Sequence, residues 1–196
     1  MFMTVLKADS RSLIKAKTPL QVRDAYKVHQ WLTHQQDSSR VADNLLYHVE
    51  IEAHHIMLYI QSETMFNLRG VEDKGFVVVQ ANVPVKVPQV VGETVYFQVR
   101  VLPHKYYGAQ RMRITNQAER DEWFVAKCEQ CGLDVLDCQA CHMSPILFTK
   151  NNKTISEPAC IYAGVAVVKD IEAVNNMLRH GFGRGKAWGA GLFMTA

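Results

Sequence analysis

Five of the eleven glycines lie in one short segment, GFGRGKAWGAG, at residues 181–191. They are Gly181, Gly183, Gly185, Gly189 and Gly191. Glycine permits positive φ and close approach of another backbone. Backbone N–H groups in such a loop can form an anion-binding nest, which Arg184 and Lys186 would reinforce. The segment lacks the G-x-x-x-x-G-K-[ST] pattern of a phosphate loop, and it is no dinucleotide fingerprint because it follows a predicted helix. Anion binding is one prediction here, and a flexible connection is the other.

Tyr26 and His29 stand three residues apart in a segment with helical periodicity. Residues at this spacing lie on one side of a helix, so both rings could reach one substrate. The apolar arc of the helix consists of Val22, Ala25, Val28 and Leu32. His29 projects inside this arc and Tyr26 lies at its margin. The pattern alone favours a structural histidine and an amphipathic edge tyrosine over a catalytic pair.

Four of the five cysteines form two pairs, Cys128-x2-Cys131 and Cys138-x2-Cys141. Paired CxxC motifs are typical of zinc sites when about 15–20 residues separate them. Only six residues separate these pairs, and we expect the first at a helix end and the second on a strand. Buried reduced cysteines are the preferred interpretation, and structural zinc is the alternative. An odd cysteine count without an export signal predicts a reducing cytoplasm.

The net charge is only +3, too small by itself to indicate a nucleic-acid partner. The basic residues are nevertheless concentrated in three segments of the sequence. Residues 1–36 hold six Lys/Arg against two acids, residues 99–118 hold four against none, and residues 173–196 hold three against none. These segments would form one basic surface only if the fold brings them together.

The length of 196 residues allows one large domain or two of about 95 residues each. Hydrophobic residues make up 48% and charged residues 21%, which excludes a disordered tail, a collagen-like fibre and a long coiled coil. No apolar run is long enough to predict a membrane-spanning helix. The N-terminal MFMTVLKADSR is charged too early to be a signal peptide.

The elements that must position the candidate residues begin with a β-α-β-β-α-β order. Strands are expected at residues 3–9, 44–52, 54–63 and 75–86. Thr18, Pro19 and Gln21 suit the N-cap, the first helical position and the capping-box position, so we predict a helix from there to about Gln35. A weaker helix is expected within residues 63–74.

The second half repeats this order. Strands are expected at residues 94–102, 133–143, 159–169 and 192–195. Asn116 and Glu119 form a capping box for a helix ending near Gly132, and Asp170 caps a helix that ends at Gly181. The sequence therefore predicts the α+β class with two tandem ferredoxin-like (RRM-like) βαββαβ units, residues 1–90 and 91–196. Such units occur in RNA-binding proteins, sensors and enzymes, so this fold does not decide the function.

Three segments resemble the CasE-type branch of the CRISPR-associated repeat-processing endoribonucleases, which serves the type I-E Cascade complex. They are RDAYKVHQ at residues 23–30, NLLYHVE at residues 44–50 and GFGRGKAWGAGLFMTA at residues 181–196. The matches come from both halves in the expected order, and the resemblance covers nearly the whole chain. It implies two ferredoxin-like units, with a histidine and a tyrosine facing the scissile phosphate in the cleft between them.

The resemblance implies that Tyr26 and His29 are catalytic. RNA carries its own nucleophile, the 2′-hydroxyl, whose attack on the adjacent phosphorus leaves a 2′,3′-cyclic phosphate and a 5′-hydroxyl. Histidine suits proton transfer because its ordinary pKa is about 6.5. His29 would act as base or acid, Tyr26 would position the bond, and Arg184 and Lys186 would steady the phosphate. No cofactor or metal is expected in the reaction.

The resemblance also implies an RNA stem-loop as substrate, cut at the 3′ side of its base. Such stems are recognised mostly through phosphates and 2′-hydroxyls. Arg111 and Arg113 alternate, so on an extended hairpin both would project from one face. The candidate RNA contacts are these two, Arg23, Lys27, Arg100, Lys105, Arg184, Lys186 and the five glycines of residues 181–191. A solvated loop is the alternative for residues 99–118.

The function expected from the sequence is thus a metal-independent endoribonuclease that stays on the mature guide RNA as a Cascade subunit. Its expected partners are the repeat RNA and other Cascade subunits, with no membrane. The alternatives are a catalytically inactive RNA-hairpin-binding subunit of the same fold and a zinc-stabilised adaptor that binds protein.

Overall fold

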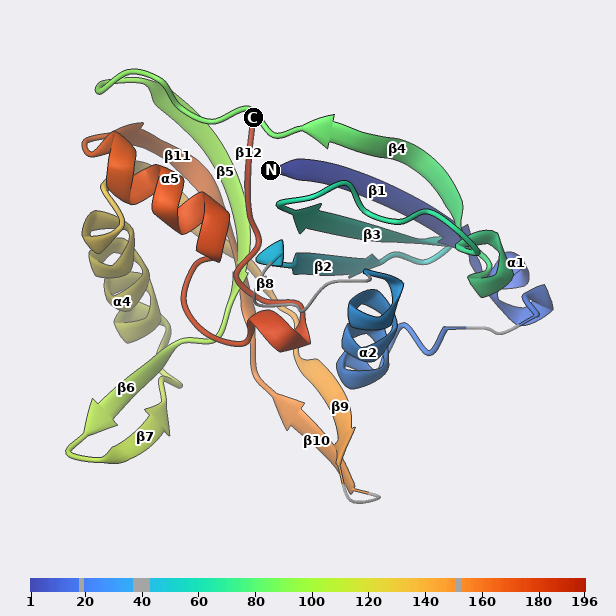
Figure 1. The fold of residues 1–196 in the computed structure, drawn as a ribbon. Helices are drawn as coiled ribbons and strands as arrows, with labels where there is room; N and C mark the ends of the chain where they lie inside the picture. The colour runs from blue at the N-terminus through green and yellow to red at the C-terminus, as the bar shows by residue number, and fades with distance from the viewer. Residues whose placement is uncertain (18–19, 37–42, 151–152) are drawn as a thin grey trace. The chain divides into compact units, whose positions relative to one another are not determined.

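The computed structural model describes residues 1–17, 20–36, 43–150 and 153–196. The chain is of the mixed α+β class with antiparallel sheets, and it divides into two compact units (Figure 1). Unit 1 comprises Met1–Val85, Ile146–Ser156 and Lys186–Gly189, and unit 2 comprises Lys86–Pro145, Glu157–Gly185 and Ala190–Ala196. The units are therefore interleaved along the sequence. A division into consecutive domains at residue 90 stays a prediction.

Unit 1 contains a four-stranded antiparallel sheet in the order β2-β3-β1-β4. Its strands are β1 (Phe2–Asp9), β2 (Leu46–Ile51), β3 (His55–Ser62) and β4 (Val77–Pro84). The helical elements that the structure describes in it are α1 (Ser10–Lys15), α2 (Ala25–Gln35) and the 3₁₀ turns η1 (Glu72–Lys74) and η2 (Lys186–Trp188). The hairpin of β9 (Ile146–Lys150) and β10 (Lys153–Glu157) joins this unit, except for the last residue of β10. The four strands predicted for the first half are confirmed.

The helix α2 starts later than predicted. The Asp24 carboxylate accepts hydrogen bonds from the N–H groups of Tyr26 at 3.0 Å and Lys27 at 3.3 Å. These bonds satisfy two N–H groups that have no partner within the helix, so the helix begins after Asp24. The predicted start at Thr18 and Pro19 is wrong, because residues 20–24 are not helical; Thr18 and Pro19 themselves lie outside the described residues. The predicted end at Gln35 is confirmed.

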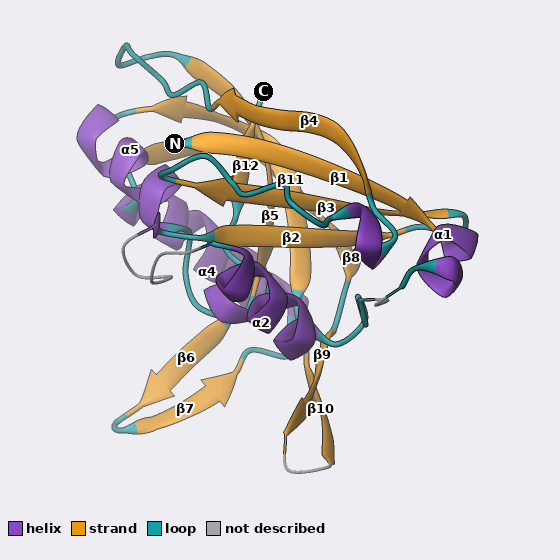
Figure 2. Cartoon of the chain, turned by 45° about the vertical axis from the view of Figure 1, so that its right-hand side comes forward, coloured by secondary structure: helices purple, strands orange, loops and turns teal. Residues whose placement is uncertain are grey.

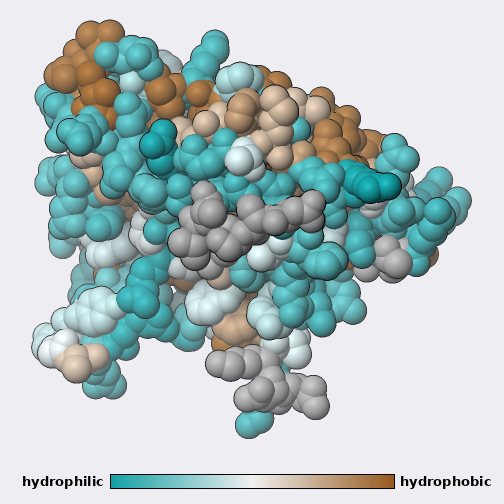
Figure 3. Space-filling view, viewed as in Figure 1, coloured by the Kyte–Doolittle hydropathy of each residue, from teal (hydrophilic) through white to brown (hydrophobic). Residues whose placement is uncertain are grey.

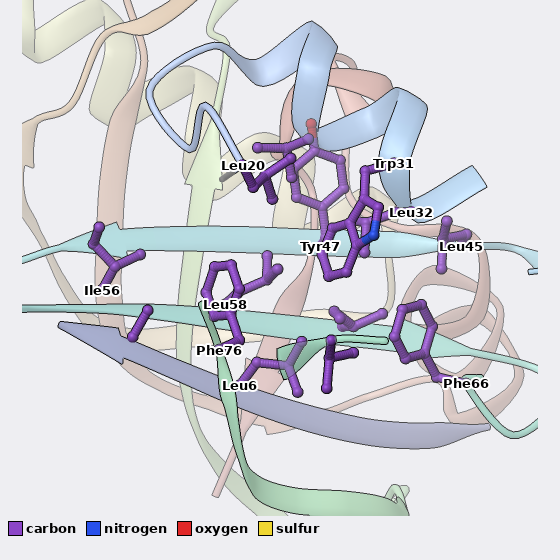
Figure 4. Packing of buried hydrophobic residues seen from close by; sticks show 14 residues of the cluster. Leu6, Leu20, Trp31, Leu32, Leu45, Tyr47, Ile56, Leu58, Phe66 and Phe76 are labelled. Carbon is purple, nitrogen blue, oxygen red and sulfur yellow. The ribbon is translucent and has the colours of Figure 1, made fainter. Parts of the chain in front are cut away.

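The core of unit 1 lies between its sheet and α2 (Figure 4). The Trp31 ring of α2 stacks on Phe76 at 6.0 Å and meets Phe66 edge-on at 6.4 Å. Leu32 and Val28 of the same helix are fully buried. Burial of each such side chain contributes about 1.5–3 kcal/mol. The packing fixes the rotation of α2 about its axis, and therefore which of its residues face away from the sheet.

Unit 2 contains a second four-stranded antiparallel sheet, in the order β12-β5-β11-β8. Its strands are β5 (Thr94–Val101), β8 (Leu133–Met143), β11 (Cys160–Val168) and β12 (Phe193–Thr195). Its helices are α4 (Gln117–Gln130) and α5 (Ile171–His180). The predictions of these six elements are confirmed. Between β5 and α4 the chain forms the hairpin of β6 (His104–Tyr107) and β7 (Gln110–Arg113).

The N-caps of α4 and α5 are the residues that the sequence predicts. Asp170 caps α5, and Gly181 with φ 81° ends it, as predicted. At α4 the Asn116 side chain accepts from the N–H of Glu119 at 3.2 Å. The Glu119 carboxylate, expected to complete a capping box, instead accepts a hydrogen bond from Lys105 Nζ at 2.7 Å. None of the described helices is long and apolar enough to cross a membrane.

The edge strand β4 exposes an apolar row (Figure 3). Val77, Val79 and Val83 are 59%, 56% and 45% exposed, and the strand carries no charged residue. Within the described part of the chain, β4 pairs on one side only, with β1. Natural edge strands are usually blunted by charges, so this edge is prone to association.

Candidate functional site

The predicted pair Tyr26 and His29 lies on α2. Tyr26 is 44% exposed, and His29 is partly buried. Thr33 donates its hydroxyl proton to the carbonyl oxygen of His29 at 2.7 Å, and the same Oγ1 lies 3.5 Å from His29 Nδ1. Because the Thr33 proton is already used, its lone pairs are what Nδ1 meets. The Thr33 hydroxyl therefore lies beside the imidazole ring of His29 on the same helix.

The 3₁₀ turn η2 packs against α2 and β2 within unit 1. Tyr47 of β2 joins these elements, because its Oη lies 2.8 Å from the Ala25 carbonyl oxygen and 3.0 Å from that of Ala187. The Tyr47 side chain is 1% exposed. Gly189 lies against this ring, where a Cβ would stand 2.9 Å from Cε2. Lys186, the first residue of η2, is therefore held on the turn that packs against α2.

An aromatic stack ties η2 to the β9–β10 hairpin. The Trp188 ring lies 4.7 Å from that of Phe148 with an angle of 14° between their planes. The helix α2 also contacts β9, and Figure 2 shows the two side by side. Three elements from distant parts of the sequence thus meet around the N-terminal half of α2.

A shallow groove of about 270 Å³ lies beside the segment that leads into α2. It is lined by Gln21, Arg23, Asp24, Leu147, Phe148, Thr149 and Thr154. Arg23 and, on the helix itself, Lys27 are exposed. Unit 1 therefore gathers Arg23, Tyr26, Lys27 and His29 on α2 and its entry, with Lys186 on the adjoining turn.

In unit 2 the β6–β7 hairpin carries arginines on one face. Its register pairs Tyr106 with Arg111 and His104 with Arg113, so these four side chains share that face. The predicted extended geometry of Arg111 and Arg113 is confirmed. Lys105 lies on the opposite face, where it forms its ion pair with the Glu119 carboxylate.

Several of the predicted RNA-contact cations already have protein partners. Arg113 Nη2 lies 3.1 Å from Glu157 Oε1. The Arg100 guanidinium donates to the Ser144 hydroxyl, and the Arg184 guanidinium donates to the Tyr106 hydroxyl. Among the described residues, Arg111 forms no hydrogen bond and no ion pair.

His104 lies at the root of this hairpin with 9% of its surface exposed. Its burial lowers its pKa, and the nearby cations of Arg111 and Arg184 lower it further. The bond to the Leu102 carbonyl and the Glu157 carboxylate act in the opposite direction. The ring is therefore held neutral at neutral pH.

All five glycines of residues 181–191 adopt positive φ, between 66° and 83°. Three of their amides already bind carbonyl oxygens: Gly181 to Met177, Gly189 to Lys186 and Gly191 to Arg100. These N–H groups are not available to an anion, so a nest can involve only the remaining part of the loop. The RNA-binding role of the glycines stays a prediction.

The cysteine pairs occupy the predicted elements. Cys128 is buried in α4 and Cys131 ends that helix, whereas Cys138 and Cys141 lie on β8. Burial raises the pKa of the Cys128 and Cys138 thiols. Within the described ranges, no group of three or more His, Cys, Asp or Glu side chains is arranged to hold a metal ion.

Three residues of these regions did not emerge from the sequence: Thr33, Tyr47 and Glu157. Thr33 follows His29 by four residues, so helical spacing could have indicated it. Tyr47 lies within NLLYHVE, where its role in holding η2 left no local signal. Glu157 meets Arg113 only through the tertiary fold.

No curated protein matches the chain. Solved structures do match it along its full length. CRISPR endoribonuclease Cse3 bound to a 19-nucleotide RNA is 22% identical, with a TM-score of 0.86 and 100% of each chain covered. Thermus thermophilus Cse3, bound to an RNA representing a pre-cleavage complex, is 21% identical, with a TM-score of 0.79 and 100% of each chain covered.

A chain of a CRISPR RNA-guided surveillance complex in its pre-nicking form is 23% identical, with a TM-score of 0.73. The match covers 100% of this chain and 99% of that one. At these identities the likeness establishes the fold. Residues 1–196 match a protein family described as "CRISPR associated protein". This match confirms the resemblance carried by the three sequence segments. The chain belongs to this CRISPR-associated protein family.

Proposed function

We propose that this protein is a metal-independent endoribonuclease that cleaves CRISPR precursor RNA at the 3′ base of the repeat stem-loop. The observation that carries the proposal is the arrangement on α2. An exposed Tyr26 precedes a partly buried His29 by one turn, and η2 with Lys186 packs against the same helix. One structurally similar protein is a CRISPR endoribonuclease bound to a 19-nucleotide RNA, and another is bound to an RNA representing a pre-cleavage complex. Both agree with this proposal.

The proposed reaction uses the 2′-hydroxyl of the RNA as nucleophile. Its oxygen bonds to the adjacent phosphorus, the bond from phosphorus to the 5′-oxygen breaks, and the products end in a 2′,3′-cyclic phosphate and a 5′-hydroxyl. His29 removes the 2′-hydroxyl proton or supplies one to the leaving oxygen. Tyr26 orients the scissile bond. Lys186 and Arg184 stabilise the charge that develops on the phosphate.

RNA binding in this proposal uses the cations of both units. The candidates are Arg23, Lys27, Arg100, Lys105, Arg111, Arg184, Lys186 and the glycines of residues 181–191. Arg113, also expected from the sequence to contact RNA, is instead paired with Glu157. After cleavage the protein stays on the guide RNA as a subunit of Cascade, since a similar chain occurs in an RNA-guided surveillance complex. None of the five cysteines forms a disulfide, which fits a cytoplasmic protein.

The proposal includes two tandem ferredoxin-like units as the scaffold, in domains of residues 1–90 and 91–196. Each unit has a four-stranded antiparallel sheet. In each, the core strands taken in chain order lie in the spatial order fourth, first, third, second. This shared order supports the assignment. The β9–β10 hairpin and η2 come from the second half of the sequence but belong to unit 1.

Incubation of the purified protein with the repeat RNA of its own array, in EDTA, tests the function. Cleavage that yields a cyclic-phosphate end, and that stops when the nucleotide before the cut is 2′-deoxy, is the expected result. Binding without cleavage would establish the alternative, a catalytically inactive RNA-hairpin-binding subunit. Cleavage that requires a divalent metal or ignores the 2′-deoxy change contradicts the proposed mechanism.

A further inference from the structure

A buried carboxylate lies at the root of the β6–β7 hairpin. The Glu157 side chain is 9% exposed, whereas its partner Arg113 is 48% exposed, and their closest N and O atoms are 3.1 Å apart. Removing one partner of such a pair leaves a charge buried without compensation. Arg113 is therefore committed to Glu157 rather than to a ligand on the hairpin face.

His104, beside this pair, supplies no competing donor. Its Nδ1 lies 2.7 Å from the Leu102 carbonyl oxygen, which can only accept, so Nδ1 carries the hydrogen and Nε2 has a lone pair. His104 Nε2 and Glu157 Oε2 are both buried, and neither has a hydrogen-bond partner within the described part of the chain. The root thus holds buried acceptors in excess, and Arg113 is the cation that Glu157 binds.

Arg111 and Arg184 contrast with Arg113. Arg111 is exposed and, among the described residues, binds no protein group. Arg184 is exposed as well, and it contacts the hydroxyl of Tyr106, which is itself 56% exposed. Tyr106 pairs with Arg111 across the hairpin, so both cations border the same exposed ring.

We propose that Glu157 and Arg113 are positioning residues that fix the hairpin root, and that Arg111 and Arg184 are the cations that contact the phosphates of the RNA stem. This inference rests on the RNA-binding part of the proposed function. It divides the two arginines of β7 into Arg111, which contacts the RNA, and Arg113, which holds the hairpin root in place.

The two roles differ in salt dependence. Each lost phosphate contact lowers the slope of log affinity against log salt by about 0.7–0.9. Affinity of the wild-type protein and its variants for the repeat hairpin RNA should therefore be measured over a range of salt concentrations. Arg111→Met is expected to weaken binding and lower the slope. Arg113→Met combined with Glu157→Met removes one charge of each sign and replaces the ion pair by two apolar side chains that can still fill the hairpin root. This variant should therefore keep wild-type affinity and slope.

Arg111→Met combined with Glu157→Met is the matched control, because it makes the same change in net charge. It should bind weakly with a lowered slope. The inference is overturned if the Arg113 double variant loses affinity and slope as this control does. If the wild-type protein binds no repeat RNA at all, the proposed function fails as well.

Thermal unfolding without RNA gives a second readout. Arg113→Ala should lower the unfolding temperature, because it leaves Glu157 buried and unpaired, whereas Arg111→Ala should not. Equal unfolding temperatures for the two variants would contradict the positioning role even if RNA binding were affected.

Discussion

The surroundings of α2 in unit 1 and the root of the β6–β7 hairpin in unit 2 hold their candidate functional side chains in different ways. Around α2 the fixing contacts are the buried Tyr47 hydroxyl, the close approach of Gly189 and the ring stack of Trp188 on Phe148. At the hairpin root they are an ion pair and a buried histidine. Packing and the Tyr47 hydroxyl position the first region, whereas an ion pair positions the second. Variants around α2 should therefore affect cleavage, and variants of the hairpin should affect RNA binding.

The largest expected effect comes from His29→Ala. Loss of a group that moves a proton in the transition state should slow cleavage of the repeat RNA about 10²–10⁴-fold. Affinity for the RNA hairpin should stay unchanged, because its proposed phosphate contacts lie elsewhere. His34→Ala, an exposed histidine on the same helix, is the control and should cleave normally. Wild-type cleavage by His29→Ala would remove this residue from the mechanism.

The next largest effect is expected from Gly189→Ala. Its Cβ would stand 2.9 Å from the Tyr47 ring, and the residue has φ 75°. The variant should unfold at lower temperature and cleave at least severalfold more slowly, because η2 is pushed from its place. Gly92→Ala is the matched control, since Gly92 has φ 91° and an added Cβ there would meet no atom within 4 Å. It should show only the backbone strain of about 1–2 kcal/mol. Equal losses in both variants would show that contact with Tyr47 is unimportant.

A smaller effect is expected from Tyr47→Phe, which keeps the ring and removes the hydroxyl. Loss of the bonds to the Ala25 and Ala187 carbonyl oxygens should cost about 0.5–1.5 kcal/mol of stability. Cleavage should fall by a few fold, while RNA affinity and its salt slope stay at wild-type values. A change in the salt slope would contradict the separation of cleavage, around α2, from phosphate binding, at the hairpin.

The smallest effect concerns pH and the hairpin root. The pKa of folded His104 lies below its ordinary 6.5, mainly because the ring is buried. As pH falls, the unfolded chain binds this proton before the folded one, so His104 subtracts stability below about pH 6.5. Unfolding temperatures measured between about pH 7 and pH 5 should therefore fall less steeply for His104→Gln than for the wild type. Identical slopes would contradict the lowered pKa.

Local patterns predicted the strands and the end residues Asn116, Asp170 and Gly181 of α4 and α5 correctly, because these residues act within one or two turns of the chain. The Glu119 half of the predicted capping box was wrong, since that carboxylate binds Lys105. The start of α2 was misread because Asp24 offers a cap nearer to the first apolar turn than Thr18 does. The β9–β10 hairpin and the position of η2 depend on contacts with α2, which no local pattern encodes. Likewise, spacing predicted that Arg111 and Arg113 share a face, but only the fold shows that Glu157 binds one of them.

The interleaving of the units has a consequence for how the protein forms during synthesis. Residues 186–189 leave the ribosome after all of unit 1's sheet and nearly all of unit 2 have been made, yet they complete the surroundings of α2. A nascent chain can therefore bury its first core early while η2 is still missing. Contacts between residues so far apart in sequence form slowly, so assembly around α2 should be the late step of folding. A gene split at residue 90 would place α2 and η2 on different polypeptides, so the surroundings of α2 would require association of the two halves.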